Sequence, residues 1–255
     1  MAEEIKIKQY TIGRGRPLIC VPIVEIEKEQ ICRVAKDAVC QGAEVLEWRM
    51  DWFARIGQWS ETEEILRDLA KVCQETILLC TFRSKPQGGE RQLAEAEYIQ
   101  LLQSIAESGY ADLLDLEVFQ CANASAVIQR LHQVKQRIIG SQHYLSHTPE
   151  KMQMRQELLQ MREMGADIGK LAVMPQNSMD VLHLLGATIQ IKEICPDYPL
   201  VTMAMGGLGT VSRLSGQVFG SCMTFASLGK TSAPGQLPLQ DVTMILEKIS
   251  ESIQR

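Results

Sequence analysis

The sequence predicts an α/β fold, a (β/α)8 TIM barrel formed as a single domain over residues 1–255. Strand-like runs and helical patterns alternate along the whole chain, and eight such pairs are the element order of a (β/α)8 barrel. A chain of 255 residues is long enough for one such barrel. No Gly-x-Gly-x-x-Gly turn follows the first strand, which disfavours an open dinucleotide-binding sheet.

The strands are predicted from apolar, β-favouring runs of the kind that a parallel sheet buries on both faces. Residues 5–12, followed by glycines at 13 and 15, have the pattern of a short N-terminal β-hairpin that would close the bottom of the barrel. The eight barrel strands are then expected at residues 18–23, 45–50, 76–82, 111–118, 137–143, 168–174, 200–205 and 220–225.

Several of the intervening helices have recognisable start signals. Residues 60–63, Ser-Glu-Thr-Glu, form a capping-box pattern ahead of an amphipathic run. Thr148 precedes Pro149, which predicts an N-cap residue followed by proline at the first helical position. Asn177 precedes an apolar stripe, and Asp241 opens a last amphipathic segment.

Composition excludes several classes of protein. Net charge is -5 with no lysine or arginine block, so we expect no nucleic-acid partner. No signal peptide and no apolar stretch of membrane-spanning length is present, so we expect a cytoplasmic protein without a membrane partner. The eight cysteines form no Cys-x-x-Cys pair and read as reduced, mostly buried thiols.

Lys170 is a lone lysine in a run that otherwise has the pattern of a buried strand. Burying an ammonium group is unfavourable unless the group is paired or gives up its proton. A neutral lysine amine attacks carbonyl carbons and can form a Schiff base. On the local sequence alone, a strand-edge lysine that extends to water fits equally well.

In a (β/α)8 barrel the functional residues lie at the carboxyl ends of the strands. Side chains alternate along a strand, so residues two apart share a face, whereas Asp167 should point away from Lys170. The unusual polar residues and methionines at the strand ends are Glu47 and Arg49 on the second strand, Arg83 after the third, Asp115 and Glu117 on the fourth, His143 on the fifth, Lys170 on the sixth, and Met203 and Met205 on the seventh.

Each of these residues also has a structural interpretation. His143 alone is more often a structural histidine than a catalyst. Glu47, Arg49 and Asp115 could form a structural ion-pair layer inside the barrel, and methionines commonly fill cores. A metal site is not expected, because His147 lies in a loop and no second ligand pair accompanies it.

Two further segments indicate ligand binding. The glycine-rich turn at residues 206–209 opens a helix that carries Arg213, and this arrangement favours an anion, either phosphate or carboxylate. The loop at residues 230–236 after the eighth strand has small and polar residues, and it is either a lid or a plain connector.

Taken together, these segments resemble the type I 3-dehydroquinate dehydratases, the Schiff-base-forming enzymes of the shikimate pathway. The matching stretches run in the family's order and cover nearly the whole chain. They are Leu46-Glu-Trp-Arg-Met-Asp51, Thr81-Phe-Arg-Ser84, Gly88-Gly-Glu90, Asp112-Leu-Leu-Asp-Leu-Glu117, the His143 segment ending in His147-Thr-Pro-Glu150, Lys170-Leu-Ala-Val-Met-Pro175, Met203-Ala-Met205, Ser212-Arg213 and Ser232-Ala-Pro-Gly-Gln236.

The resemblance implies a barrel that is commonly a homodimer, needs no metal or organic cofactor, and acts in aromatic amino acid biosynthesis. It implies that Lys170 attacks the C3 ketone of 3-dehydroquinate, and that the resulting iminium acidifies the C2 proton. His143 would remove that proton and later protonate the departing C1 hydroxyl. Asp115 would orient His143, and the product would be 3-dehydroshikimate.

The resemblance also implies how the substrate is held. Arg213 would bind the carboxylate together with Ser232 and Gln236 from the lid. Glu47, Arg49 and Arg83 would bind the hydroxyls, and Met203, Met205 and Phe225 would form an apolar wall. The three arginines would disfavour the ammonium form of Lys170 and attract an anionic substrate to an acidic protein.

The chain departs from the family pattern at two places. Gln87 stands where the family commonly has a glutamate that assists proton handling, and an amide cannot exchange protons in that role. We expect activity to survive, with slower later steps and Gln87 positioning a hydroxyl or a water. Tyr144 and Leu145 stand where the family usually has aspartate and phenylalanine, a change expected to affect packing alone.

Two other functions remain compatible with the pattern. A class I aldolase or transaldolase is another barrel with a Schiff-base lysine, and the glycine turn at 206–209 would suit its phosphorylated substrates. A non-catalytic barrel that binds shikimate-type ligands is the second alternative, although Lys170 and His143 argue for catalysis.

Overall fold

Eight parallel strands form the central sheet of the computed structural model, which describes residues 4–254. They are β3 Leu18–Ile23, β4 Val45–Arg49, β5 Ile77–Thr81, β6 Leu113–Leu116, β7 Arg137–His143, β8 Ile168–Val173, β9 Leu200–Ala204 and β10 Met223–Phe225. β10 pairs with β3 at one edge. At the other edge, Cys222 lies just ahead of β10, and its N–H donates to the Leu200 carbonyl of β9 at 2.7 Å, which closes the barrel. The predicted (β/α)8 barrel is confirmed.

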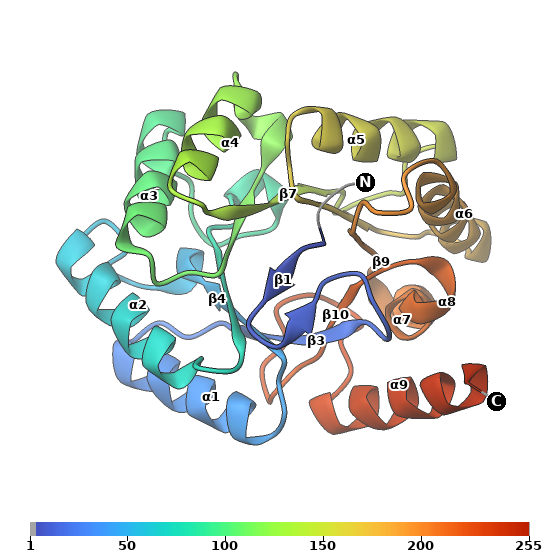
Figure 1. Cartoon of the computed structure of the whole chain (residues 1–255), viewed down its shortest axis with the longest axis horizontal. Coiled ribbons are helices and arrows are strands. Elements are labelled where there is room, and N and C mark those ends of the chain that lie inside the picture. The colour runs from blue at the N-terminus through green and yellow to red at the C-terminus, as the bar shows by residue number, and fades with distance from the viewer. Residues whose placement is uncertain (1–3, 255) are drawn as a thin grey trace.

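Helices surround the barrel and follow the strands in sequence, as Figure 1 shows. They are α1 Lys28–Cys40, α2 Trp59–Val72, α3 Glu95–Ser108, α4 Ala124–Gln133, α5 Lys151–Glu163, α6 Ser178–Ile194, α7 Gly206–Leu214, α8 Gly216–Phe219 and α9 Leu239–Ile253, with short 3-10 turns η1 Met50–Trp52, η2 Lys85–Gln87 and η3 Val118–Gln120. In the described part of the chain, no helix has both the length and the apolar character needed to cross a membrane.

The helix starts agree with the sequence signals only in part. Asn177 caps α6 as predicted, because its side chain accepts the Asp180 N–H. The capping-box prediction at residues 60–63 is wrong: the Gln58 carbonyl already accepts backbone N–H groups, so α2 starts earlier. Thr148 is not an N-cap either, since the first turn of α5 starts from the Glu150 carbonyl.

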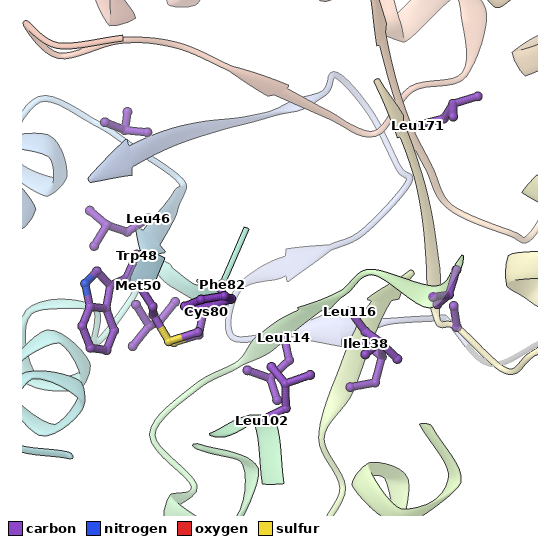
Figure 2. Close-up of a cluster of buried hydrophobic side chains, with 14 of the residues drawn as sticks. Leu46, Trp48, Met50, Cys80, Phe82, Leu102, Leu114, Leu116, Ile138 and Leu171 are labelled. Carbon is purple, nitrogen blue, oxygen red and sulfur yellow. The ribbon is translucent and has the colours of Figure 1, made fainter. Parts of the chain in front are cut away.

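Side-chain alternation divides the barrel into an outer and an inner core. Leu46 and Trp48 of β4 face outward and pack in the cluster between strands and helices (Figure 2). Val45 faces inward and joins an interior cluster with Ile77 of β5 and other apolar side chains. Since residues two apart share a face, Glu47 and Arg49 must also point inward, nearer the carboxyl end of the strand.

The N-terminal hairpin closes the amino-terminal end of the barrel, as predicted. β1 Lys6–Ile7 and β2 Tyr10–Thr11 pair antiparallel, and the hairpin lies across the strands in Figure 1. Ile5, Ile7 and Ile12 are buried within the interior cluster. Residues Met1–Glu3 and Arg255 lie outside the described residues. The eight cysteines are free thiols, and most of them are buried, namely Cys20, Cys73, Cys80, Cys195 and Cys222.

Candidate active site

A cavity of about 320 Å³ opens at the carboxyl ends of the barrel strands. Its lining residues are Glu47, Arg49, Arg83, Gln87, Gly88, His143, Leu145, Lys170, Ala172, Met174, Met203, Met205, Arg213, Phe225, Ser232, Ala233, Pro234 and Gln236. All the predicted site residues except Asp115 are among them. Asp115 is fully buried beside the cavity, in contact with Lys170.

Lys170 is the buried amine of the site. Its side chain is 4% exposed, and Nζ lies 3.1 Å from Asp115 Oδ2 and 3.5 Å from Glu47 Oε1. The Phe225 ring packs against it, with Nζ 4.7 Å from the ring centroid. The alternative of a strand-edge lysine that extends to water is therefore wrong. Three arginines share the cavity as expected, but the ion-pair partners of Lys170 are carboxylates.

Asp115 and Arg83 form the centre of a buried ion-pair network. Arg83 Nη2 lies 2.9 Å from Asp115 Oδ2, and Arg83 Nη1 lies 2.8 Å from Glu117 Oε1. The Ser141 hydroxyl donates to Asp115 Oδ1 at 2.6 Å. Burial would raise the pKa of Asp115, but Arg83 and Lys170 outweigh it and hold this pKa well below its usual range. Asp115 is thus ionised, and its carboxylate pairs with both Arg83 and Lys170.

His143 is held by Gln87. The two side chains meet at 2.8 Å between His143 Nδ1 and Gln87 Oε1. Burial, together with the nearby charges of Arg83 and Lys170, lowers the pKa of His143 well below its ordinary value, so the imidazole is neutral near pH 7. Asp115 was expected to orient His143, but in residues 4–254 its carboxylate bonds to Lys170, Arg83 and Ser141 instead.

Asp51 organises the loop that carries Arg83 and Gln87. Its buried carboxylate pairs with Arg49 through two contacts of 2.8 Å, Nε to Oδ1 and Nη2 to Oδ2. The same carboxylate accepts the backbone N–H groups of Arg83 at 3.3 Å and Glu90 at 3.0 Å. Arg49 is therefore fixed on one side of the cavity, and the loop after β5 is anchored on the same group.

Arg213 is a buried guanidinium with few partners. It is 4% exposed and reaches the cavity from α7. Nη2 donates to the Pro234 carbonyl at 3.1 Å and Nη1 contacts Met203 Sδ at 3.6 Å, while Nε has no partner. Within the described residues it forms no ion pair with a carboxylate. Burial lowers the pKa of Arg213 to about 10, as expected for a cation that lacks a counter-charge.

The loop after β10 lies against the start of α7 and borders the cavity. Gln236 Oε1 accepts the Ser232 N–H at 2.9 Å, and Gln236 Nε2 donates to Ser232 Oγ at 2.9 Å. The Gly206 N–H donates to the Pro234 carbonyl at 3.1 Å. The glycine turn at 206–209 does begin a helix, as predicted, but none of its residues lines the cavity. The cationic group of this segment that lines the cavity is Arg213.

Sequence reasoning missed several residues of this site. Ala172 and Ser141 lie two positions from Lys170 and His143, and strand alternation would have placed both inside the barrel. Gly88 and Leu145 line the cavity from loops, where no periodic signal exists. No group of three or more histidine, cysteine, aspartate or glutamate side chains in residues 4–254 is arranged to hold a metal ion.

Comparison with known proteins places these features in a family. The model of the type I 3-dehydroquinases matches residues 19–253. A 3-dehydroquinate dehydratase of Clostridioides difficile is 38% identical over 254 residues, which cover 99% of this chain and 100% of that one. A Klebsiella pneumoniae protein of the same name is 37% identical over 251 residues, which cover 98% and 100% of the two chains.

Solved structures give the same result. A type I 3-dehydroquinate dehydratase from Clostridium difficile, with covalently modified comenic acid, superposes with a TM-score of 0.95 at 38% identity, over 99% of this chain and 100% of that one. A 3-dehydroquinate dehydratase from Geobacillus kaustophilus also superposes with a TM-score of 0.95, at 36% identity, over 99% and 98% of the two chains.

Proposed function

The chain belongs to the type I 3-dehydroquinase family, and we propose that it dehydrates 3-dehydroquinate to 3-dehydroshikimate through a Schiff base on Lys170. Family membership makes it a 3-dehydroquinate dehydratase of the shikimate pathway. The observation that carries the covalent mechanism is one cavity lined by a buried amine, a neutral imidazole and an unpaired guanidinium, those of Lys170, His143 and Arg213. A substrate with a ketone and a carboxylate matches these groups.

The reaction starts when the Lys170 ammonium gives up one proton and the free amine adds to the C3 ketone. That proton goes to the carbonyl oxygen, which leaves the carbinolamine as water and gives an iminium. The neutral His143 removes a proton from C2, and the iminium accepts the electron pair as an enamine. The C1 hydroxyl leaves as water after protonation by His143, and the C1–C2 double bond forms. Hydrolysis of the iminium releases 3-dehydroshikimate and frees Lys170, so that one water is lost overall.

The other cavity residues orient the substrate. Arg213 binds the carboxylate together with Ser232 and Gln236, since its Nε donor has no partner within the described chain. Glu47, Arg49 and Arg83 bind the ring hydroxyls, while Met203, Met205 and Phe225 form the apolar wall. Asp115 holds Lys170 and Arg83 in place. Gln87 keeps the His143 ring in position.

We further infer that the barrel is a single catalytic domain that acts as a cytoplasmic homodimer in aromatic amino acid biosynthesis, without metal or organic cofactor. Eight free thiols support a reducing compartment. Sedimentation equilibrium tests the dimer, and activity after exhaustive chelation tests the absence of a metal requirement.

Borohydride trapping tests the covalent step. Incubation with 3-dehydroquinate and borohydride should reduce the iminium to a stable amine, and peptide mass spectrometry should find the adduct on Lys170. Lys170→Met should show no adduct and no rise in enone absorbance. Turnover by the unaltered protein with Lys170 unmodified would falsify the mechanism, and binding without turnover or adduct would restore the non-catalytic alternative.

A further inference from the structure

Two carboxylates flank the amine of Lys170. Its Nζ lies 3.1 Å from Asp115 Oδ2 and 3.5 Å from Glu47 Oε1. Lys170 belongs to β8 and Glu47 to β4, which lie four strands apart in the eight-stranded barrel and therefore face each other across its interior. Carboxylates nearby favour the ammonium form of a lysine. An ammonium has no lone pair for a carbonyl carbon, so a proton must leave Lys170 before it can attack a ketone.

Asp115 is poorly suited to take that proton. Its carboxylate lies 2.9 Å from Arg83 Nη2 and accepts the Ser141 hydroxyl at 2.6 Å. Arg83 and Lys170 hold the pKa of Asp115 well below its usual range, which makes this carboxylate a weak base. Asp115 is also fully buried beside the cavity rather than in its lining, so it does not face the oxygen of a bound ketone.

Glu47 differs from Asp115 in both respects. It lines the cavity although it is only 3% exposed, so its carboxylate borders the space that a substrate fills. In residues 4–254, Lys170 is the one cation with which it forms an ion pair. Its other hydrogen-bond partner is neutral: the Thr81 hydroxyl donates to Oε1 at 2.9 Å and fixes the carboxylate beside the amine.

Two arginines of the cavity have carboxylate partners of their own. Arg49 pairs with Asp51 through two contacts of 2.8 Å. Arg83 pairs with Asp115 at 2.9 Å and with Glu117 at 2.8 Å. Within the described chain, neither guanidinium is bonded to the carboxylate that approaches the amine from β4. That carboxylate can therefore accept a proton without giving up an arginine partner.

We propose that Glu47 is the proton carrier of Schiff-base formation, and that it moves protons from the Lys170 nitrogen to the C3 oxygen of the bound ketone. This role deepens the proposed function and rests on it, because Lys170 must form the iminium. Glu47 would then act on the reacting atoms as well as on a ring hydroxyl. Proton transfer within the pair also replaces two buried charges by two neutral groups, which lowers the cost of burial once substrate fills the cavity.

The steps balance with Glu47 as the carrier. Glu47 takes one proton from the ammonium, the nitrogen lone pair adds to C3, and Glu47 returns this proton to the resulting oxyanion. The nitrogen is then positively charged and still carries two hydrogens. Glu47 takes one of them and passes it to the C3 hydroxyl, which leaves as water while the carbon–nitrogen double bond forms. Two protons have moved from nitrogen to oxygen, and Glu47 is again a carboxylate.

The test measures the rate of iminium formation. The protein is mixed with 3-dehydroquinate, quenched at increasing times into excess borohydride, and the Lys170 adduct is quantified by mass spectrometry. Glu47→Gln keeps the size and the hydrogen bonding of the side chain but cannot exchange protons. The rate should fall at least about a hundredfold, the usual contribution of general acid–base catalysis.

A binding measurement separates proton transfer from the holding of substrate. Quinate has the ring hydroxyls and the carboxylate of the substrate but an alcohol in place of the ketone, so it binds without forming an iminium. Its Kd should change less than about tenfold in Glu47→Gln, because the amide still forms a hydrogen bond with a hydroxyl. Glu163→Gln removes a charge from an exposed position on α5, and it should change neither the rate nor the Kd.

Chemical rescue gives a readout that a purely structural role would not move. Glu47→Ala leaves room for a small carboxylate beside Lys170, so added formate should restore part of the rate of iminium formation. Formate should not accelerate Glu47→Gln, whose side chain fills that space, or the unaltered protein. Glu47→Ala also carries the test if Glu47→Gln does not fold.

The proposal is overturned if Glu47→Gln forms the iminium as fast as the unaltered protein, or if formate does not accelerate Glu47→Ala. Either result, with the adduct still found on Lys170, removes the proton carrier and leaves the covalent mechanism intact. An unaltered protein that turns over without any adduct on Lys170 removes both.

Discussion

His143 Nδ1 lies 2.8 Å from the amide oxygen of Gln87. In the described part of the chain, the hydrogen-bond partner of Nδ1 is therefore an amide and not a carboxylate. A neutral partner can receive the Nδ1 proton but adds little stabilisation when the ring becomes an imidazolium. This one contact therefore affects both the protonation state of the base and its response to pH.

The pH dependence of kcat/KM should reflect the lowered pKa of His143. A base works in its neutral form, so activity should persist below the ordinary histidine pKa of about 6.5 and fall only as the pH drops through the lowered value. Gln87→Glu places a carboxylate beside Nδ1, and its negative charge raises the pKa of His143. The acidic limb of the kcat/KM profile should therefore move to higher pH. An acidic limb that stays in place would contradict this account.

Gln87→Glu should also change the later steps of the reaction. A carboxylate at position 87 keeps His143 protonated after it has taken the C2 proton, so a larger fraction of the protein holds the acid that the departing C1 hydroxyl needs. We therefore expect faster release of that hydroxyl in single-turnover measurements. Stopped-flow absorbance of the enone product measures the rate. If single-turnover rates are the same in both proteins at their pH optima, position 87 does not influence proton transfer.

Arg213→Met should weaken substrate binding and yet leave the fold as stable or more stable. The guanidinium is buried without a counter-charge in the ligand-free protein, so its replacement by an apolar side chain removes an unfavourable burial. Loss of its contact with the substrate carboxylate should raise the barrier for kcat/KM by about 2–5 kcal/mol. Steady-state kinetics and urea unfolding measure the two effects. A destabilised variant would mean that Arg213 is paired within the protein.

Asp115→Asn should destabilise the protein strongly. The change leaves Arg83 and Lys170 without their shared buried carboxylate, and breaking such a pair typically lowers the free energy of unfolding by about 3–5 kcal/mol. Asp68→Asn removes a partly exposed partner of Lys28 and Lys71 on the surface of α2 and should change that free energy by less than about 1 kcal/mol. Similar urea midpoints for the two variants would show that the buried network contributes little.

The stability due to Asp115 also has a defined pH range, because the pKa of this residue is lowered in the folded protein. The contribution should be fully present above the unfolded pKa of about 3.9 and should be lost as the pH falls toward the lower folded value.

Gly89→Ala should disrupt the loop that carries Gln87 while the barrel remains folded. A Cβ at Gly89 would lie 1.8 Å from the Arg83 carbonyl oxygen, which is backbone and cannot rotate away. Gly57→Ala is the control, since no atom lies within 4 Å of its Cβ position. We expect at least a hundredfold drop in kcat/KM for Gly89→Ala, because an active-site displacement of about 1 Å can have this effect, and no change for Gly57→Ala. Full activity of Gly89→Ala would show that the loop adapts.

The sequence was sufficient to predict the barrel and the positions that face its cavity. Strand alternation depends only on local spacing, so Glu47, Arg49, Met203 and Met205 were assigned to the same end and to the interior. The partner of His143 was not predicted correctly from the sequence. Gln87 reaches it from a loop whose path depends on Asp51 and Gly89, and spacing along the chain carries no information about such a path.

Closure of the barrel bottom by the hairpin determines how molecules reach the site. Ile5, Ile7 and Ile12 fill that end, and the apolar interior lies between them and the charged layer. Within residues 4–254, the cavity opens at the carboxyl ends of the strands, beside the loop at residues 232–236, and the end that the hairpin fills lies opposite. Substrate and product should therefore use the same opening, and a compound bound there should block both delivery and release.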